Sequence, residues 1–168
     1  MRADAVKPTS WDDSMIEAED ACARKLAEVM GMTAGQNFFT GIKSDNAVDC
    51  AVFDIGKPES GDRFGFVADH FHFRGQVDLY NRDRRQIMRW IMRIFGSMPM
   101  QTAQATACKL PNTNVECFRV QPLNNSMNVI TTVEIPVGKI ADLKKVEVFT
   151  TSVFFDIVFF AGERPPAV

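Results

Sequence analysis

A long alternating segment that leads directly into an amphipathic helix constrains the fold of this chain most strongly. From Phe64 to Tyr80, apolar side chains occur at one parity, namely Val67, Phe71, Phe73, Val77 and Leu79. Polar side chains occupy the other parity, namely His70, His72, Arg74, Gln76 and Asp78. Successive side chains of a strand point to opposite faces, so this pattern predicts a long strand with one wet face. Gly75 is a candidate position for a bend in it.

The segment that follows predicts a helix over about residues 82–97, with Asn81 as its cap and Pro99 beyond its end. Its expected apolar stripe comprises Ile87, Met88, Ile91, Ile94, Phe95 and Met98. The opposite side carries an arginine stripe, formed by Arg82, Arg85, Arg89 and Arg93. Guanidinium groups bind phosphate and carboxylate well. The stripe is therefore a candidate wall facing nucleic acid, a candidate subunit interface with the acidic first helix, or a solvated surface.

Helical periodicity also predicts a first helix at about residues 11–30, with Ser10 as N-cap and Gly31 as C-cap. Acidic residues near its start suit the positive end of the helix dipole, and they are Asp12, Asp13 and Glu17. Strands are expected at 37–43 and 47–55 around a turn at 44–46, and later at 115–121, 127–137 and 145–161. The last is apolar on both faces beyond Val153, which indicates a central place in the sheet or cover by a second layer.

This order of elements predicts an α+β fold with a mainly antiparallel sheet of about six strands. The two helices are expected on one face, in the order α-β-β-β-α-β-β-β. We expect a single domain over residues 10–161 that includes an extended loop at 99–114, flanked by arms at 1–9 and 162–168. The chain of 168 residues is long enough to bury a sizeable core. Its 14 Phe lie mainly on the expected strands and are interpreted as sheet core.

The charge of the chain is distributed unevenly. The net charge of −2 is the sum of −6 over residues 1–80 and +4 over residues 81–168. A chain with an acidic front half and a basic back half could associate head-to-tail with copies of itself. The alternative is that both sets of charges are simply solvated.

The residues that could support catalysis are few. His70 and His72 would lie on the same side of a strand beside Asp69, where two imidazoles could share a metal, but no third ligand is identified. A pair of surface histidines is the alternative. Neither a dinucleotide-binding glycine motif after a strand nor a Walker loop is found. We therefore expect no enzyme activity, no cofactor and no metal.

The four cysteines lack metal-ligand spacing and are interpreted as reduced, mostly buried thiols in a cytosolic protein, at Cys22, Cys50, Cys108 and Cys117. No run of about 18 apolar residues occurs, so no transmembrane helix is expected. The first residues lack the apolar region of a secretory signal, so none is expected either.

One segment carries a resemblance to a known family. A strand passes into a helix through FRGQVDLYNRDRRQIMRWIMRIFGSMP (73–99), and the chain later reaches an apolar strand, VFFDIVFF (153–160). The junction between strand and helix contains Asp78, Tyr80, Asp83 and Arg84. Together with the order of elements over residues 12–160, this resembles the tail-terminator or tail-completion proteins of long-tailed bacteriophages.

The resemblance implies a virion structural protein of the tail or neck that assembles in the host cytoplasm. Its subunits would form a ring, usually a hexamer, that caps the tail tube, joins it to the neck proteins and encloses a DNA channel. It implies no catalytic residues and no membrane partner. Another neck or head–tail joining protein is the alternative within this class, and a small metal-dependent enzyme using Asp69, His70 and His72 is the alternative outside it. The candidate interface or channel residues are Arg82, Arg85, Arg89, Arg93, Asp12, Asp13 and Glu17.

Overall fold

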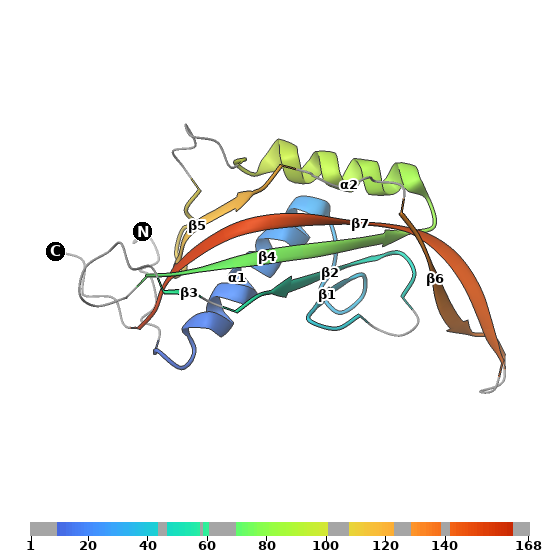
Figure 1. Ribbon diagram of the computed structural model, residues 1–168, viewed down its shortest axis with the longest axis horizontal. Coiled ribbons are helices and arrows are strands. Elements are labelled where there is room, and N and C mark those ends of the chain that lie inside the picture. Colours follow the sequence, from blue (N-terminus) through green and yellow to red (C-terminus); the bar gives the residue numbers. More distant parts are fainter. Residues whose placement is uncertain are drawn as a thin grey trace, which may run out of the picture.

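The computed structural model describes residues 10–43, 47–57, 59–60, 70–100, 108–122, 129–138 and 142–162. Two helices and a sheet account for most of them (Figure 1). In chain order the elements are α1 (Ser14–Met30), β1 (Phe38–Thr40), β2 (Cys50–Ile55), β3 (Glu59–Ser60), β4 (His70–Asn81), α2 (Arg84–Ser97), β5 (Val115–Val120), β6 (Val129–Pro136) and β7 (Leu143–Phe160). Neither described helix is long and apolar enough to cross a membrane.

The fold is α+β, as the order of elements predicted, but the sheet is mixed rather than mainly antiparallel. Its strands lie in the order β1-β2-β4-β7-β5, with β3 paired to β4 and β6 paired to β7. β1 runs parallel to β2, while the remaining pairs are antiparallel. The expected order α-β-β-β-α-β-β-β is not found, because the short β3 adds a strand before β4.

The parallel pairing of β1 explains why the expected arrangement of the first strands was wrong. Strands at 37–43 and 47–55 around a tight turn would lie antiparallel. Instead Phe38 pairs with Ala51 and Thr40 with Phe53. The strands are therefore parallel, and a tight turn cannot connect the end of β1 to the start of β2. Beyond Thr40 the Gly41 N–H donates to the Phe53 carbonyl at 2.8 Å, and its φ of 80° lies in the left-handed region that favours glycine. The predicted turn at 44–46 lies outside the described residues.

β7 is the central strand of the sheet, as its two apolar faces indicated. On one edge it pairs with β4 from His70↔Phe160 to Asn81↔Phe149 without a break in register. On the other edge it pairs with β5 and then with β6. The sheet is therefore organised around a strand of 18 residues.

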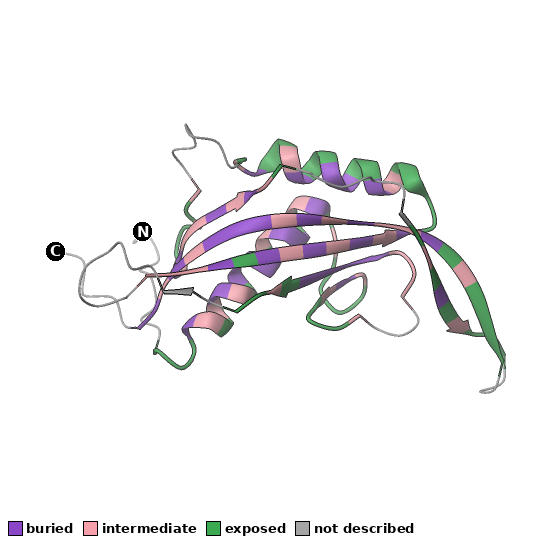
Figure 2. Cartoon of the chain, in the orientation of Figure 1, coloured by how far each residue is buried: buried purple, intermediate pink, exposed green. Residues whose placement is uncertain are grey.

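Both helices pack on the same face of the sheet. One parity of β4 and β7 joins them in a single buried cluster, which includes Phe73, Val77, Leu79, Val153, Phe155 and Ile157 (Figure 2). From the helices the cluster receives Ala18, Cys22, Leu26, Ile87, Trp90, Ile91 and Ile94. The phenylalanine excess is sheet core, as interpreted, because the largest fully buried side chains begin with five strand phenylalanines: Phe38, Phe53, Phe73, Phe118 and Phe155.

Gly75 lies where side chains of β7 and β2 pack directly against the backbone of β4. A Cβ at this position would come within 2.7 Å of Ile157 Cδ1 and 3.1 Å of Phe53 Cε1. The register of β4 with β7 continues unbroken through it. Tight packing against these two side chains therefore accounts for the glycine.

A loop was expected at 99–114, and arms were expected at the two ends of the chain, at 1–9 and 162–168. Within 99–114, residues 108–110 run alongside β5, since the Phe118 N–H donates to the Cys108 carbonyl at 2.8 Å. Gly162, assigned to the second arm, donates to Ser14 Oγ at 2.9 Å and so lies against the start of α1. Residues 1–9, 101–107 and 163–168 lie outside the described residues.

β6 and the first part of β7 form a two-stranded ribbon that projects past the end of β4 (Figure 1). The pairing of β4 with β7 ends at Phe149, whereas that of β6 with β7 continues to Pro136↔Leu143. Residues 143–148 are therefore paired on one edge alone among the described strands. Large apolar side chains are exposed in this region, namely Ile130, Val137 and Leu143.

Candidate functional site

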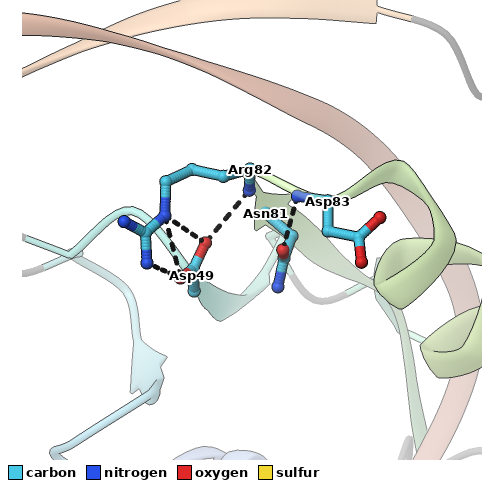
Figure 3. A network of polar contacts seen from close by, with 4 residues as sticks. All are labelled: Asp49, Asn81, Arg82 and Asp83. Atoms are coloured by element: carbon cyan, nitrogen blue, oxygen red, sulfur yellow. Dashed lines mark hydrogen bonds and ion pairs between the residues drawn. The ribbon is translucent and has the colours of Figure 1, made fainter.

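The four arginines of the predicted stripe do not form one surface, because two of them bond to other parts of the fold. Arg82 is the first of these two. Arg82 precedes α2 and turns toward Asp49, the residue just before β2 (Figure 3). Its side chain bonds both carboxylate oxygens, and its backbone N–H donates to Asp49 Oδ1 at 3.0 Å. Partial burial opposes ionisation of Asp49, but these hydrogen bonds outweigh it and hold the pKa of the carboxyl below its usual range. Arg82 therefore fastens the start of α2 to the sheet.

Arg93 is the second residue that serves the fold. Its Nη1 donates to the carbonyl oxygen of Met30 at 2.8 Å. Met30 is the last residue of α1, whose final carbonyls have no partner within the helix. Arg93 thus joins the end of α1 to the second half of α2.

Arg85 and Arg89 remain exposed, and Arg84 joins them. Met88 precedes Arg89 and Met92 follows it, and these methionines are 38% and 67% exposed. The five residues line a shallow hollow of about 510 Å³ along the outer side of α2. We refer to Arg84, Arg85, Met88, Arg89 and Met92 as the α2 basic surface. Met88 was expected in the core, but Trp90 is buried there instead.

The predicted acidic residues lie at the other helix. Asp12 and Asp13 are exposed in the turn that begins α1, and Glu17 is half-buried one turn later. Asp13 occupies the N-cap position in place of Ser10, whose Oγ donates to Asp13 Oδ2 at 2.9 Å. Ile16 and Asp20, which were not singled out from the sequence, are exposed beside them. We refer to Asp12, Asp13, Ile16 and Asp20 as the α1 acidic surface.

The structure does not bring these two surfaces together within one chain. Among the described residues no ion pair joins the predicted arginines to Asp12 or Asp13. The reason is geometric, because the contact between Arg93 and Met30 places α2 against the C-terminal end of α1. The α1 acidic surface lies at the opposite end of that helix.

The junction motif of the resemblance forms the helix start. Asp83, rather than Asn81, is the N-cap of α2, and its side chain accepts from the Arg85 N–H at 2.9 Å. Asn81 stabilises the preceding turn, since its Oδ1 accepts from the Asp83 N–H at 2.8 Å (Figure 3). Asp78 accepts from Ser152 Oγ at 2.5 Å on the neighbouring strand. These residues direct the chain from β4 into α2.

The open face of the sheet carries a second charged group. Asp156, in the last third of β7, is only 7% exposed. One of its oxygens contacts His72 Nε2, and the other accepts from Arg119 Nη2 at 3.2 Å. A buried carboxylate needs such partners, so the three side chains fix one another across β4, β7 and β5. The sequence signal for this cluster was an acid within the apolar run VFFDIVFF, which was not used.

His70 and His72 share one face, as the alternation predicted, but they have different neighbours. The His70 ring lies edge-on to Phe160 with centroids 5.4 Å apart, while His72 turns toward Asp156. Asp69 lies outside the described residues. Within the part of the chain that the structure describes, no group of three or more His, Cys, Asp or Glu side chains could hold a metal ion.

The four cysteines are free thiols, two buried and two half-buried. Burial raises the pKa of Cys50 to about 11 and that of Cys117 to about 12. Such thiols carry little thiolate near neutral pH.

A groove runs along the projecting ribbon as far as its last pair, Pro136 and Leu143. It has a volume of about 620 Å³ and is lined by Lys43, Tyr80, residues 131–134, Pro136 and Leu143. It combines one cation, one phenol and the polar edge of β6.

No model of a known protein family matches the chain, and no curated protein is significantly similar to it.

Proposed function

We propose that this chain is a structural protein of a bacteriophage virion, a ring subunit of the tail-terminator type. The ring would cap the tail tube and join it to the neck, with DNA passing through its channel. It would assemble in the host cytoplasm, from six copies in the usual case. The resemblance of residues 71–95 to that family supports the proposal, together with the way Asn81 and Asp83 turn β4 into α2.

The observation that carries the proposal is the ribbon of β6 and β7. A two-stranded ribbon standing alone is at best marginally stable in water, and unpaired strand edges invite pairing with another chain. Here the ribbon extends beyond the sheet with Ile130 and Leu143 more than half exposed. A partner protein would cover these side chains and satisfy the free edges. In a tail assembly, that partner is the tube or the next protein of the neck.

Another neck or head–tail joining protein is the alternative within the same class, because such a protein would use the same ribbon on a different partner. The two are distinguished by which component is bound. A terminator binds the open end of the tail tube, whereas a neck protein binds the connector and leaves the tube end free.

The test combines native mass spectrometry with electron microscopy of the full-length chain mixed with purified tail tubes. We expect a closed ring and a cap at one tube end. Replacing Ile130 and Leu143 with Ser should leave the ring intact and abolish capping. A matched I42S variant alters another exposed apolar residue, 85% exposed and outside the ribbon, and should still cap. A chain that stays monomeric and never joins a tube or a connector would contradict the proposal.

A further inference from the structure

We infer that the α2 basic surface of one copy docks on the α1 acidic surface of a second copy. This inference deepens the proposed function and rests on it, since it supplies the contact that would close the ring. It commits to a second copy of the chain as the partner.

The α2 basic surface is unfavourable for its own helix. Arg84 and Arg85 lie in the first turn of α2, where the acidic residue is the N-cap Asp83, whose carboxylate already accepts from the Arg85 N–H. Cations at the positive end of a helix dipole are unfavourable. Arg85 and Arg89 are four residues apart, where like charges repel. Carboxylates supplied by another molecule would relieve both effects.

Two methionines give this surface an apolar component. Met88 and Met92 lie four residues apart on the exposed side of α2, one before and one after Arg89 in the sequence. Met is flexible and polarisable, and it is frequent at protein contact surfaces. Phosphate groups alone would leave these side chains uncovered. The surface therefore fits an acidic protein surface that also offers an apolar side chain.

The α1 acidic surface has the complementary pattern. Asp12 lies in the turn before α1, and Ile16 and Asp20 lie four residues apart on the exposed side of its first two turns, so an exposed apolar side chain lies among carboxylates. Ile16 is 60% exposed. On α2, Met88 lies three residues after Arg85 and next to Arg89 in the sequence, so an exposed apolar side chain lies among guanidinium groups. Placing Ile16 against Met88 would bring the carboxylates within reach of the arginines. Arg24 limits the acidic surface to the first two turns of α1.

The partner must be another molecule, because α2 contacts its own α1 at the far end, through Arg93 and Met30. Two different surfaces on one chain give a head-to-tail contact. Such a contact repeats from copy to copy and closes into a ring when the rotation between copies allows it.

Charge exchange tests the contact without disturbing the core. The first variant, R85E/R89E, reverses the basic surface, and the second, D12K/D20K, reverses the acidic surface; Asp13 is left intact because it is the N-cap. Each should lower the association constant at least tenfold and yield monomers by native mass spectrometry. An equimolar mixture should assemble again with the two variants alternating, because a contact between two unaltered surfaces is then followed by a contact between two reversed surfaces of opposite charge. A single chain that carries all four substitutions should assemble again, because its two reversed surfaces attract each other.

A matched control for R85E/R89E is K57E/K144E, which makes the same change in net charge outside both surfaces and should assemble normally. Circular dichroism confirms that each variant is folded. Should a charge variant fail to fold, a second route uses I16C/M88C under mild oxidation. It should form disulfide-linked multimers that neither single variant forms.

The outcomes separate this inference from the proposed function. Rings that cap tubes but ignore the charge reversals would overturn the inference alone. Charge-sensitive rings that bind no tube or connector would overturn the proposed function alone. If the reversals abolish binding of double-stranded DNA while assembly is unchanged, the α2 basic surface faces nucleic acid and the inference is wrong. A wild-type chain that remains monomeric also overturns it, as does failure of the fourfold variant to assemble.

Discussion

Arg93 Nη1 lies 2.8 Å from the carbonyl oxygen of Met30, so one guanidinium joins the middle of one helix to the end of the other. The carbonyls at the end of a helix lack partners and carry the negative end of the helix dipole. A guanidinium at this position donates a hydrogen bond to a free carbonyl and also offsets the negative end of the dipole. This contact separates Arg93 from Arg85 and Arg89, although their spacing in the sequence is regular.

We expect Arg93→Ala to lower the free energy of unfolding by about 1–2 kcal/mol, because it removes a charge-assisted hydrogen bond and a favourable dipole contact. Arg85→Ala is the matched control on the same helix and should change stability by less than about 0.5 kcal/mol. Urea denaturation of both variants measures the difference. Equal effects would contradict the role assigned to Arg93.

Asp156→Ala should destabilise the fold by about 3–5 kcal/mol, since it leaves His72 and Arg119 without their shared carboxylate partner on a half-covered sheet face. Asp49→Ala removes the surface partner of Arg82, whose side chain is 60% exposed, and should cost no more than about 1 kcal/mol. Thermal and urea unfolding compare the two. A larger effect at Asp49 than at Asp156 would refute the assignment.

Two glycines should respond in opposite directions to replacement by alanine. Gly75→Ala forces a methyl group against Ile157 and Phe53, and overpacking of this kind costs about 1–3 kcal/mol. Gly96, near the end of α2, has nothing within 4 Å of an added Cβ, so Gly96→Ala should raise stability by up to about 1 kcal/mol. Midpoints of urea unfolding test this pair, and a stabilising Gly75→Ala would count against the packing described for β4.

Alkaline pH should weaken the fold through Cys50. Burial raises the pKa of this thiol to about 11, and the nearby Lys43 offsets the rise only in part. The unfolded thiol ionises near pH 9, so the folded state binds the proton more tightly. The resulting stabilisation is complete below about pH 9 and is lost as the pH rises toward 11. The stability difference between wild type and Cys50→Ala, measured in urea with a reductant, should therefore shrink over that range. A constant difference would argue against a raised pKa.

The sequence predicted those parts of the fold that depend on local periodicity. The alternation around Phe73 and Val77 located β4, and the two apolar faces beyond Val153 indicated that β7 is central. β1 was harder, because a strand of three residues has too little pattern to set its direction. The cap of α2 was assigned to Asn81 although it is Asp83. Both side chains can accept a hydrogen bond from a helix N–H, and they are only two residues apart, so the sequence did not distinguish them.

The candidate site was predicted less completely, for a physical reason. Helical spacing placed Arg82 and Arg93 on the same stripe as Arg85, but spacing carries no information about what lies opposite each side chain. Asp49 and the Met30 carbonyl come from distant segments of the chain, and they bind two of the four predicted arginines, Arg82 and Arg93. Met88 and Trp90 are two residues apart on an amphipathic helix, and only the position of the sheet decides which one is buried.

β7 also has a mechanical consequence. A single unbroken strand carries the ribbon at one end, and at the other it lies between β4 and β5. A pull along the ribbon would load the pairing of β4 with β7 in shear, so that many backbone hydrogen bonds resist together instead of opening one by one. A force applied to the tip of the ribbon would therefore be transmitted to the centre of the sheet.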